Sequence, residues 1–537
     1  MLCRTPLACL ALLVAGTAAW AQDKTPAADA PAPKSPHPLE GLWELRMERT
    51  VWWPYLVPGS LVVSRGPNGL RASLTFDPMW GIDPKRLTVD PLSGDKVRLS
   101  LLLFGSEPHA IIEGSVADGV FSGRIDWKGA NPQETCFISA SRIASLRRLE
   151  TDSPGGPMPV ELDPTRVGID AAALDRLILY ADRYDTDSLV VVKDGRLVCD
   201  RTFLRPRCTC ETDAVTQAVA SLAIPLLVED ARLPRELDTP LSTWFPEWKS
   251  DARKSKITLR HVLTHSTGLA QYASGSGAGD YVAAALGADA LREPGERFEY
   301  NSQAIELLSG VVAKAAGEQI DTYLERRLFR PLGIARWRWP RDDAGNVPAY
   351  GALSLSGPDL ARVGWLLADG GRWQDKQLVP KWWIDEMLVP SATNEEMGLV
   401  WNLMRDPAKE TVVQTQAKLD RLVEDGFADA AKLAPLVGKS FENRRAWWAA
   451  VADILGKAGT KALYERLGQD AVGAEVRGPV TWAFLRGSKG QYLVVSPEKH
   501  LVVARNRRAF AENEIPEDIR LRAGFQNLPD LVRELTW

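Results

Sequence analysis

The stretch CETDAVTQAVASLAIPLLVEDARL, residues 210–233, begins a helix near the middle of the chain. Its apolar residues recur at the three- and four-residue spacing of a buried helical face, which predicts a helix over 215–229. At its start Ala214 and Gln217 lie three positions apart, so their side chains share one face. A hydroxyl and a base at this spacing would make a nucleophile, but the chain has a methyl group and a neutral amide here. The function depends on what surrounds these two positions.

Length and composition limit the number of domains and the classes of partner. A chain of 537 residues is too long for one domain, and we expect roughly two or three, each with its own core. Hydrophobic residues make up 45% of the chain and charged residues 25%, which is typical of a globular protein. A formal net charge of −4 gives no reason to expect nucleic acid or an anionic membrane surface as a partner.

The first residues predict export. MLCRTPLACLALLVAGTAAWAQ contains Arg4, an apolar run and the small residues around Trp20, which is the pattern of a cleaved signal peptide over 1–21. Cys9 precedes most of the apolar run, too early for a lipid-attachment cysteine. Residues 22–38 are rich in Pro and Ala and predict a disordered linker. We therefore expect a periplasmic or extracellular protein without a membrane span after cleavage.

Two kinds of pattern follow the linker. Residues 39–148 form short alternating runs separated by turn residues at about ten-residue spacing, which predicts an antiparallel β-sandwich or small barrel. Residues 149–537 have a strand hairpin around Asp194-Gly195, then helical patterns at 303–316 and 357–368, and strands again near the end. Strands at both ends with helices between them predict an α+β domain built on an antiparallel sheet. A charged, helix-rich insertion interrupts it at about 408–475.

Four cysteines follow the predicted cleavage site, and in an oxidising compartment a disulfide is expected. The spacing favours a bond from Cys199 to either Cys208 or Cys210, and the connectivity among these three and Cys136 stays open. The five histidines fit no zinc spacing, so neither a metal nor a cofactor is predicted.

Four longer stretches resemble the serine β-lactamase-like hydrolases, the penicillin-recognising group that includes class C β-lactamases, DD-peptidases, esterases and 6-aminohexanoate-dimer hydrolases. They occur in the family's order over roughly residues 165–537. The resemblance implies the β-lactamase/transpeptidase fold, an antiparallel sheet flanked by helices beside a helical subdomain. The stretches are LDTPLSTWFPEWKSDARKSKITLRHVLTHSTGL (237–269), EPGERFEYNSQAIELLSGVVAKAAGE (293–318), YGALSLSGPDLARVGWLLADGGRWQDKQLVP (350–380) and FLRGSKGQYLVVSPEKHLVVAR (484–505).

The resemblance also implies three catalytic elements. An S-x-x-K at a helix start supplies the nucleophile and its base, a Y-x-N motif assists, and a K-T-G or H-x-G strand motif binds the substrate carboxylate and completes the oxyanion hole. The first motif falls on Ala214 and Gln217, so both the hydroxyl and the base are missing. The second keeps Tyr300 but has Ser302 in place of Asn, and the third begins at Ser488 instead of Lys or His.

No other residue replaces the nucleophile. Two further S-x-x-K sequences, 93–96 and 496–499, lie in Gly- and Pro-marked turns, where Ser and Lys do not share a helical face. Thr216 is about 200° around the helix from position 214 and is expected to point into the packing. Ser302 has no Lys or His to activate it.

We therefore expect an exported, serine hydrolase-like pseudoenzyme, similar to penicillin-binding proteins, whose cleft binds a peptide, a cell-wall fragment, a small carbonyl ligand or a protein partner. Two alternatives stay open: an ester or amide hydrolase with an unrecognised nucleophile, and a binding module centred on the β-rich domain. The expected binding residues are Ala214, Tyr300, Ser302, Ser488, Gly490 and Gln491.

Overall fold

The fold is described from a computed structural model. The described residues are 37, 39–49, 57–66, 69–76, 85–91, 96–101, 110–118, 120–127, 136–143, 148, 158–203, 209–271, 279–405, 411–441, 444–467, 474–508 and 528–536. The predicted signal peptide and linker fall outside them, apart from His37.

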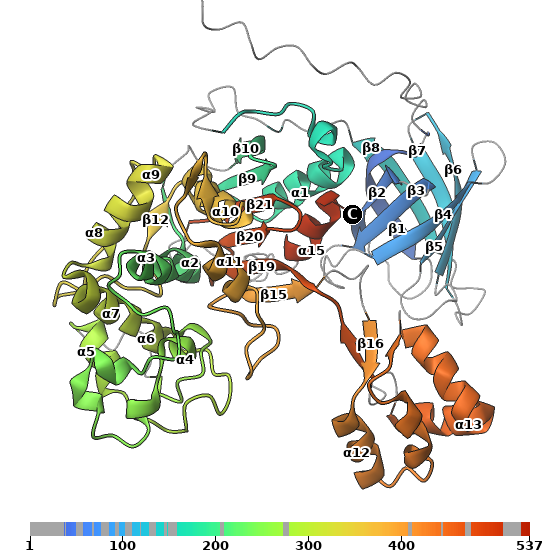
Figure 1. Ribbon diagram of the computed structural model, residues 1–537. Coiled ribbons are helices and arrows are strands. Elements are labelled where there is room, and N and C mark those ends of the chain that lie inside the picture. The colour runs from blue at the N-terminus through green and yellow to red at the C-terminus, as the bar shows by residue number, and fades with distance from the viewer. Residues whose placement is uncertain are drawn as a thin grey trace, which may run out of the picture. The chain divides into compact units, whose positions relative to one another are not determined.

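The first eight strands form a closed antiparallel barrel, drawn in blue in Figure 1. Each strand pairs with the next one along the chain, and β1 pairs with β8. The strands are β1 (Gly41–Arg49), β2 (Val57–Gly66), β3 (Gly69–Phe76), β4 (Lys85–Pro91), β5 (Lys96–Leu101), β6 (Ala110–Ala117), β7 (Val120–Trp127) and β8 (Cys136–Ile143).

Alternation along the strands decides which side chains fill the barrel. Trp43 and Leu61 belong to a buried apolar cluster contributed by all of the barrel strands. Their neighbours Leu42 and Val62 point the other way and pack in a separate cluster around α1. The Trp43 indole N–H donates to the Leu39 carbonyl oxygen at 2.8 Å, so the largest interior side chain keeps its polar atom satisfied.

The second architecture is a six-stranded antiparallel sheet with the order β10-β9-β21-β20-β19-β15. Its strands come from both ends of the domain: β9, near the start, pairs with β21, near the end. The β9–β10 hairpin turns at Asp194 and Gly195, which both have positive φ (50° and 72°), as a two-residue hairpin turn requires. The strands are β9 (Ser188–Lys193), β10 (Arg196–Thr202), β15 (Asn402–Arg405), β19 (Val480–Arg486), β20 (Tyr492–Ser496) and β21 (Leu501–Asn506).

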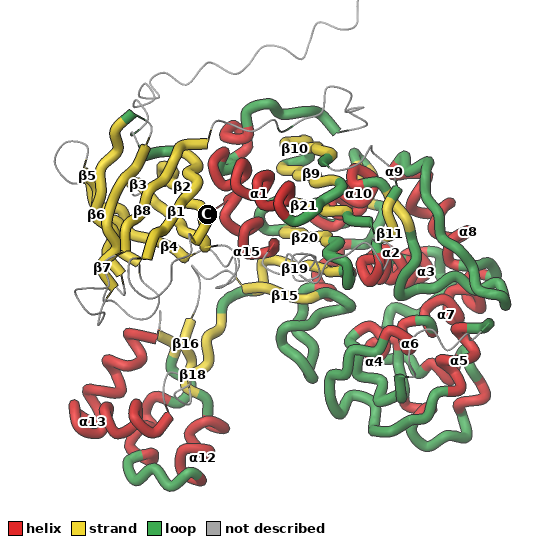
Figure 2. The backbone as a smooth tube through the Cα atoms, turned by 180° about the vertical axis from the view of Figure 1, so that it is seen from behind, coloured by secondary structure: helices red, strands yellow, loops and turns green. Residues whose placement is uncertain are grey.

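Helices cover both faces of this sheet. Figure 2 shows α1 and α15 beside one face and α2, α3 and α10 beside the other, in agreement with two separate buried clusters. Helices α4 to α9 and α11 complete this part of the chain. The helices are α1 (Ala171–Arg183), α2 (Thr216–Ser221), α3 (Ala223–Glu229), α4 (Leu259–Leu263), α5 (Tyr281–Gly287), α6 (Ser302–Ile305), α7 (Leu307–Ala316), α8 (Ile320–Leu324), α9 (Arg330–Leu332), α10 (Gly357–Ala368), α11 (Lys381–Met387) and α15 (Leu528–Arg533).

Helix α10 has the bounds that the sequence predicts. The Ser356 hydroxyl accepts from the Asp359 backbone N–H at 3.2 Å and caps the helix. The helix lies so close to the sheet that a Cβ at Gly364 would be 2.5 Å from Val502. The fold class inferred from the sequence, a β-lactamase/transpeptidase-like fold preceded by an antiparallel β-rich part, is confirmed.

Residues 411–477 lie between β15 and β19, two strands that pair directly with each other. The described residues of this range, 411–441, 444–467 and 474–477, form a three-stranded sheet with helices packed in their own apolar cluster. Helix α13 is interrupted at Gly456, where φ is 66° and ψ 175°. The elements are β16 (Thr411–Gln414), β17 (Ser440–Phe441), β18 (Ala474–Arg477), α12 (Gln416–Glu424) and α13 (Arg444–Leu467).

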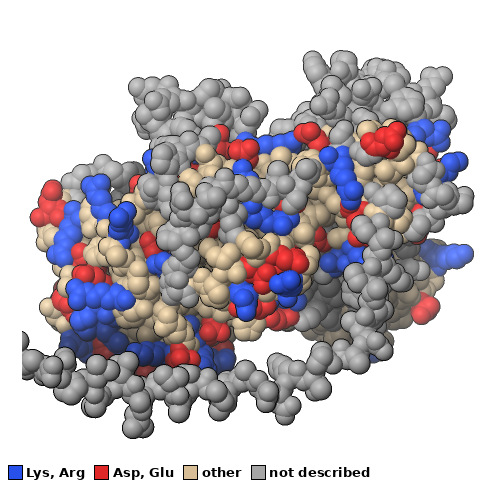
Figure 3. All heavy atoms as spheres, turned by 90° about the horizontal axis from the view of Figure 1, so that it is seen from above, with Lys and Arg blue, Asp and Glu red and all other residues tan. Residues whose placement is uncertain are grey.

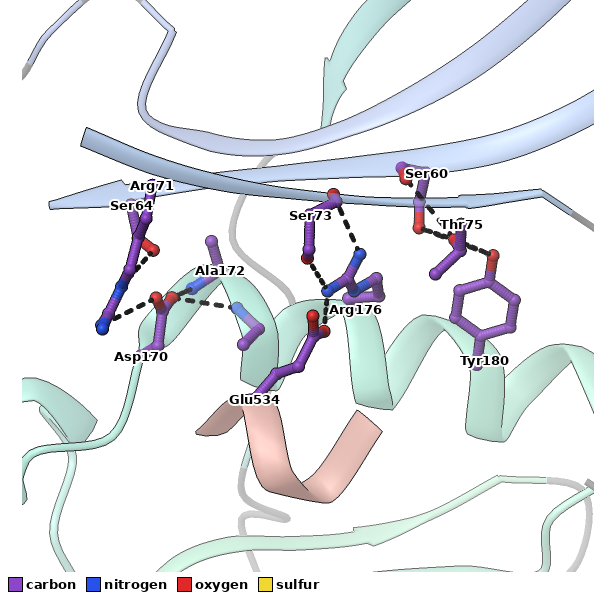
Figure 4. Close-up of polar contacts among 11 residues, drawn as sticks. Ser60, Ser64, Arg71, Ser73, Thr75, Asp170, Ala172, Arg176, Tyr180 and Glu534 are labelled. Carbon is purple, nitrogen blue, oxygen red and sulfur yellow. Dashed lines mark hydrogen bonds and ion pairs between the residues drawn. The ribbon is translucent and has the colours of Figure 1, made fainter. Parts of the chain in front are cut away.

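A buried polar network joins the barrel to α1 (Figure 4). The Thr75 hydroxyl lies 2.7 Å from both the Ser60 hydroxyl and the Tyr180 phenol oxygen. Beside them the Arg176 guanidinium donates to the hydroxyl and the carbonyl oxygen of Ser73 and to the carboxylate of Glu534. Burial lowers the pKa of Arg176 to about 10, which leaves it charged at neutral pH.

The expected disulfide from Cys199 is wrong. Cys199 is a buried thiol, with its sulfur 3.9 Å from the Leu189 carbonyl oxygen, and Cys210 is also present as a thiol. The side chain of Cys199 points from β10 into the apolar cluster around α1, whereas Cys210 belongs to the short strand β11 (Cys210–Glu211), paired with β12 (Ser354–Leu355). Cys208 lies outside the described residues.

On the face shown in Figure 3, Lys and Arg side chains are interspersed with Asp and Glu. Within the described residues, no helix combines the length and apolar character needed to cross a bilayer.

Removing Arg176 is expected to destabilise the protein far more than removing Arg183 from the same helix. Arg176→Met leaves the buried Glu534 carboxylate without its cation, a loss of about 3–5 kcal/mol, whereas the part-exposed pair of Arg183 with Glu44 contributes about 1 kcal/mol or less. Urea denaturation followed by tryptophan fluorescence measures both losses. Equal losses for the two variants would contradict the importance of the network.

Candidate functional site

The segment before α2 is held against the strand β12 and then bends sharply. The backbone N–H and the hydroxyl of Thr212 both donate to the Leu353 carbonyl oxygen, at 2.8 and 2.9 Å. Asp213 follows with a φ of 50°, and the chain enters a 3-10 turn at Asp213–Val215. Aspartate is one of the few residues that adopt this left-handed conformation readily, so the bend fixes where its side chain points.

Ala214 and Gln217 follow this bend, one helical turn apart. Ala214 is half-buried, and Gln217 is fully buried. The Gln217 Nε2 atom donates to the Tyr300 hydroxyl at 2.8 Å, so the amide joins the first motif to the second. Thr216 is buried, with its hydroxyl 3.0 Å from that of Thr212, and so points away from any ligand.

The environment of Tyr300 does not favour a phenolate. Burial raises the pKa of its hydroxyl; the hydrogen bond from Gln217 lowers it, and the negative charge of Asp213 raises it again. The His265 ring packs against the Tyr300 ring with a centroid distance of 4.5 Å. Burial lowers the pKa of His265 to about 4, so the imidazole is neutral at pH 7 and supplies no positive charge.

Ser302 begins α6, beside Tyr300. Its hydroxyl accepts from Gln271 Nε2 at 3.3 Å, and an amide is not a base that could activate it. The preceding Asn301 caps the same helix: its side-chain oxygen accepts from the Ala304 N–H, and its side-chain nitrogen donates to the Leu269 carbonyl oxygen, both at 2.9 Å. Both residues after Tyr300 are therefore hydrogen-bonded to other parts of the chain.

The third motif is the turn 487–490 between β19 and β20. The Ser488 backbone N–H donates to Asp213 Oδ2 at 2.6 Å, and the Ser488 hydroxyl is bonded to the same oxygen. The Gln491 side chain donates to the Glu211 carbonyl oxygen at 3.2 Å, and Gly490 has a φ of 85°. The turn is thus fixed against the segment that leads to Ala214.

Two buried arginines hold the turn from the side of β21. Arg505 donates to the Gly490 carbonyl oxygen and to the Thr186 hydroxyl, and Arg507 donates to the Lys489 carbonyl oxygen at 3.0 Å. Their guanidinium groups orient the turn through its backbone.

The structure links the predicted site residues in two groups. In the first group Gln217 is bonded to Tyr300, and Ser302 follows Tyr300 at the start of α6. In the second group Ser488 and Gln491 are bonded to Asp213 and to the Glu211 carbonyl oxygen, just before Ala214. Asp213, Gln271, Glu306 and Tyr350 were not predicted from the sequence. Burial and the charges of Asp213, Glu306, Tyr300 and Glu211, in that order, raise the pKa of Tyr350. Asp213 had one visible signal, its position directly before Ala214.

A buried carboxyl group lies behind the site. Glu306 is 3% exposed, and its Oε2 accepts from the Ala349 backbone N–H at 2.7 Å. Burial raises the pKa of Glu306 to about 8, although the hydrogen bonds from the backbone N–H groups of Ala349 and Tyr350 lower it. The group is therefore mostly protonated at pH 7.

The second S-x-x-K sequence at 496–499 is structural, as expected. Ser496 is fully buried in β20 and donates to the Thr481 carbonyl oxygen at 2.7 Å. Ser93 of the other sequence lies outside the described residues.

The chain is similar to proteins of one known family. A sequence model of the Beta-lactamase family matches residues 179–521. The chain is 28% identical over 214 residues to Esterase EstB of Burkholderia gladioli, a match that spans 32% of this chain and 53% of the esterase. A class C beta lactamase from Rhodobacter sphaeroides is similar in structure, with a TM-score of 0.41 and 15% identity over 68% of this chain and 99% of that one. A penicillin-binding protein homolog from Caulobacter crescentus has a TM-score of 0.44 and 16% identity over 70% and 98%.

Glu306→Gln is expected to flatten the pH dependence of stability. With a pKa of about 8 when folded and 4.5 when unfolded, Glu306 binds more protons in the folded state, so the free energy of unfolding falls as pH rises between these values. His265 acts in the opposite direction, but only between about 4 and 6.5. Between pH 6.5 and 8 the wild type should lose about 1–2 kcal/mol more than Glu306→Gln.

Urea denaturation at several pH values measures this difference. Glu247→Gln, which neutralises an exposed carboxylate, is the matched control and should keep the wild-type slope. An unchanged slope in Glu306→Gln would mean that Glu306 is ionised in the folded protein.

Proposed function

This chain belongs to the beta-lactamase family, and we propose that it is an exported, catalytically inactive member whose cleft binds a peptide-like ligand without cleaving it. The observation that carries the proposal is the pair Ala214 and Gln217 at the start of the helix that follows the bend. A methyl group has no lone pair with which to attack a carbonyl carbon. The amide of Gln217 does not accept a proton near neutral pH, and it is already bonded to Tyr300.

The surroundings of this pair support the same conclusion. Burial and the negative charge of Asp213 raise the pKa of the Tyr300 phenol and so oppose its ionisation. Ser302 is bonded to the amide of Gln271. The Ser488 donors, which the family resemblance assigns to a substrate carboxylate, are bonded to Asp213. Each residue that would carry acyl transfer therefore has a partner that does not assist that reaction.

Binding remains chemically reasonable for the same cleft. Tyr300 is 47% exposed, Ala214 is half-buried, and the backbone at positions 214 and 491 is where the resemblance places the oxyanion-hole donors. A half-exposed aromatic ring beside backbone donors suits a peptide-like ligand, which presents carbonyl oxygens and N–H groups.

The test is covalent labelling. With a fluorophosphonate probe and with a labelled penicillin, the wild-type protein should show no adduct by intact mass. Ala214→Ser combined with Gln217→Lys restores the nucleophile and its base, and should give an adduct on residue 214. Ala214→Ser alone is the matched control and should react at least about 100-fold more slowly, because a neutral amide leaves the hydroxyl protonated. An adduct on the wild-type protein would overturn the proposal.

A further inference from the structure

The contact between Asp213 and Ser488 is explained by neither the fold nor the missing nucleophile. One carboxylate oxygen, Asp213 Oδ2, accepts from two donors of the same residue, the backbone N–H at 2.6 Å and the hydroxyl. A backbone N–H and a hydroxyl that converge on one oxygen are a small anion site, and here the anion is part of the chain.

The carboxylate is placed there by the backbone. Asp213 has a φ of 50° between the anchored Thr212 and the 3-10 turn, and the Gln491 side chain ties the Glu211 carbonyl oxygen to the same turn. On the other side Gly487 leaves room for it, since a Cβ at that position would lie 3.0 Å from the Asp213 Cβ. Both partners of the contact are thus held in position before any ligand arrives.

The charge of Asp213 also reaches the rest of the cleft. It is among the causes that raise the pKa values of the Tyr300 and Tyr350 hydroxyls, and for Tyr350 it is the largest after burial. Two buried cations behind the turn, Arg505 and Arg507, donate to the carbonyl oxygens of Gly490 and Lys489. The turn also carries one cation of its own, Lys489, whereas Asp213 is the residue directly before Ala214. Ligand groups that enter beside Ala214 therefore meet a carboxylate.

We propose that Asp213 is a specificity-determining residue: its carboxylate is an internal ligand of the Ser488 donors, so the cleft rejects carboxylate-bearing ligands and accepts neutral ones. A ligand carboxylate would have to displace a charge-assisted pair of hydrogen bonds and approach a like charge. A neutral amide does not need the occupied donors and suffers no repulsion. The proposal rests on the proposed function, since it names the class of ligand for the same cleft.

The experiment compares two probes that differ only in charge, N-acetylglycine and its amide, by ligand-observed NMR titration of the full-length protein. The wild type should bind the amide in preference to the acid. Asp213→Ala frees both Ser488 donors and removes the charge, so the ratio of acid to amide affinity should rise about tenfold or more. Asp213→Asn, which keeps the shape of the side chain, should give a smaller rise. Adding Ser488→Ala to Asp213→Ala removes the hydroxyl and should reverse part of the gain.

Glu211→Ala is the matched control, because it removes one exposed carboxylate two residues from Asp213. Its acid-to-amide ratio should change less than threefold if occupancy of the donors, and not overall charge, sets the preference. An unchanged ratio in Asp213→Ala, or an equal rise in Glu211→Ala, would overturn the role of Asp213. These outcomes are separate from the labelling test, since an adduct on the wild type would refute the inactive cleft without changing the acid-to-amide ratio.

Discussion

The pairing of β9 with β21 is the interaction on which the site depends. Residues Ser188–Lys193 pair antiparallel with Leu501–Asn506, so the first hairpin of the domain and its last strands form one sheet. Because β20 pairs with β21, the turn 487–490 before β20 lies against the segment that precedes α2. Arg505, at the end of the paired β21, donates to the Gly490 carbonyl oxygen and fixes the turn from behind. Without this pairing the first and third motifs would be unrelated stretches of chain.

Much of the fold could be predicted because its signals are local. Alternation of apolar residues marks the strands, and the cap at Ser356 with the apolar period after it marks α10 to the residue. The closure of the barrel is not local: it requires β1 to pair with β8 across about a hundred residues, so the sequence leaves a sandwich and a barrel equally open. The disulfide prediction failed for a related reason. Spacing along the chain does not say that Cys199 points into an apolar cluster.

The candidate site also has a part that the sequence predicts and a part that only the folded chain reveals. Helical spacing and the order of the motifs are sufficient to place Ala214 and Gln217 together and to expect Tyr300 nearby. The bond between Asp213 and Ser488 joins residues 275 positions apart and needs a positive φ at an aspartate, which no pattern in the sequence encodes. Tyr350 and Glu306 were missed because their importance comes from burial and from neighbouring charges, and both are properties of the folded chain.

The residues at the three motif positions are bonded to neighbours within the structure, as residues that had changed together would be. A single lost hydroxyl would leave its former partners buried and unsatisfied, at a cost of about 1–3 kcal/mol each. Here the buried amide of Gln217 is bonded to Tyr300, and the exposed Ser488 is bonded to Asp213. One atom does not follow this rule: Gln217 Oε1 is buried without a hydrogen-bond partner among the described residues. A ligand donor that reached this oxygen would satisfy it and would gain a hydrogen bond.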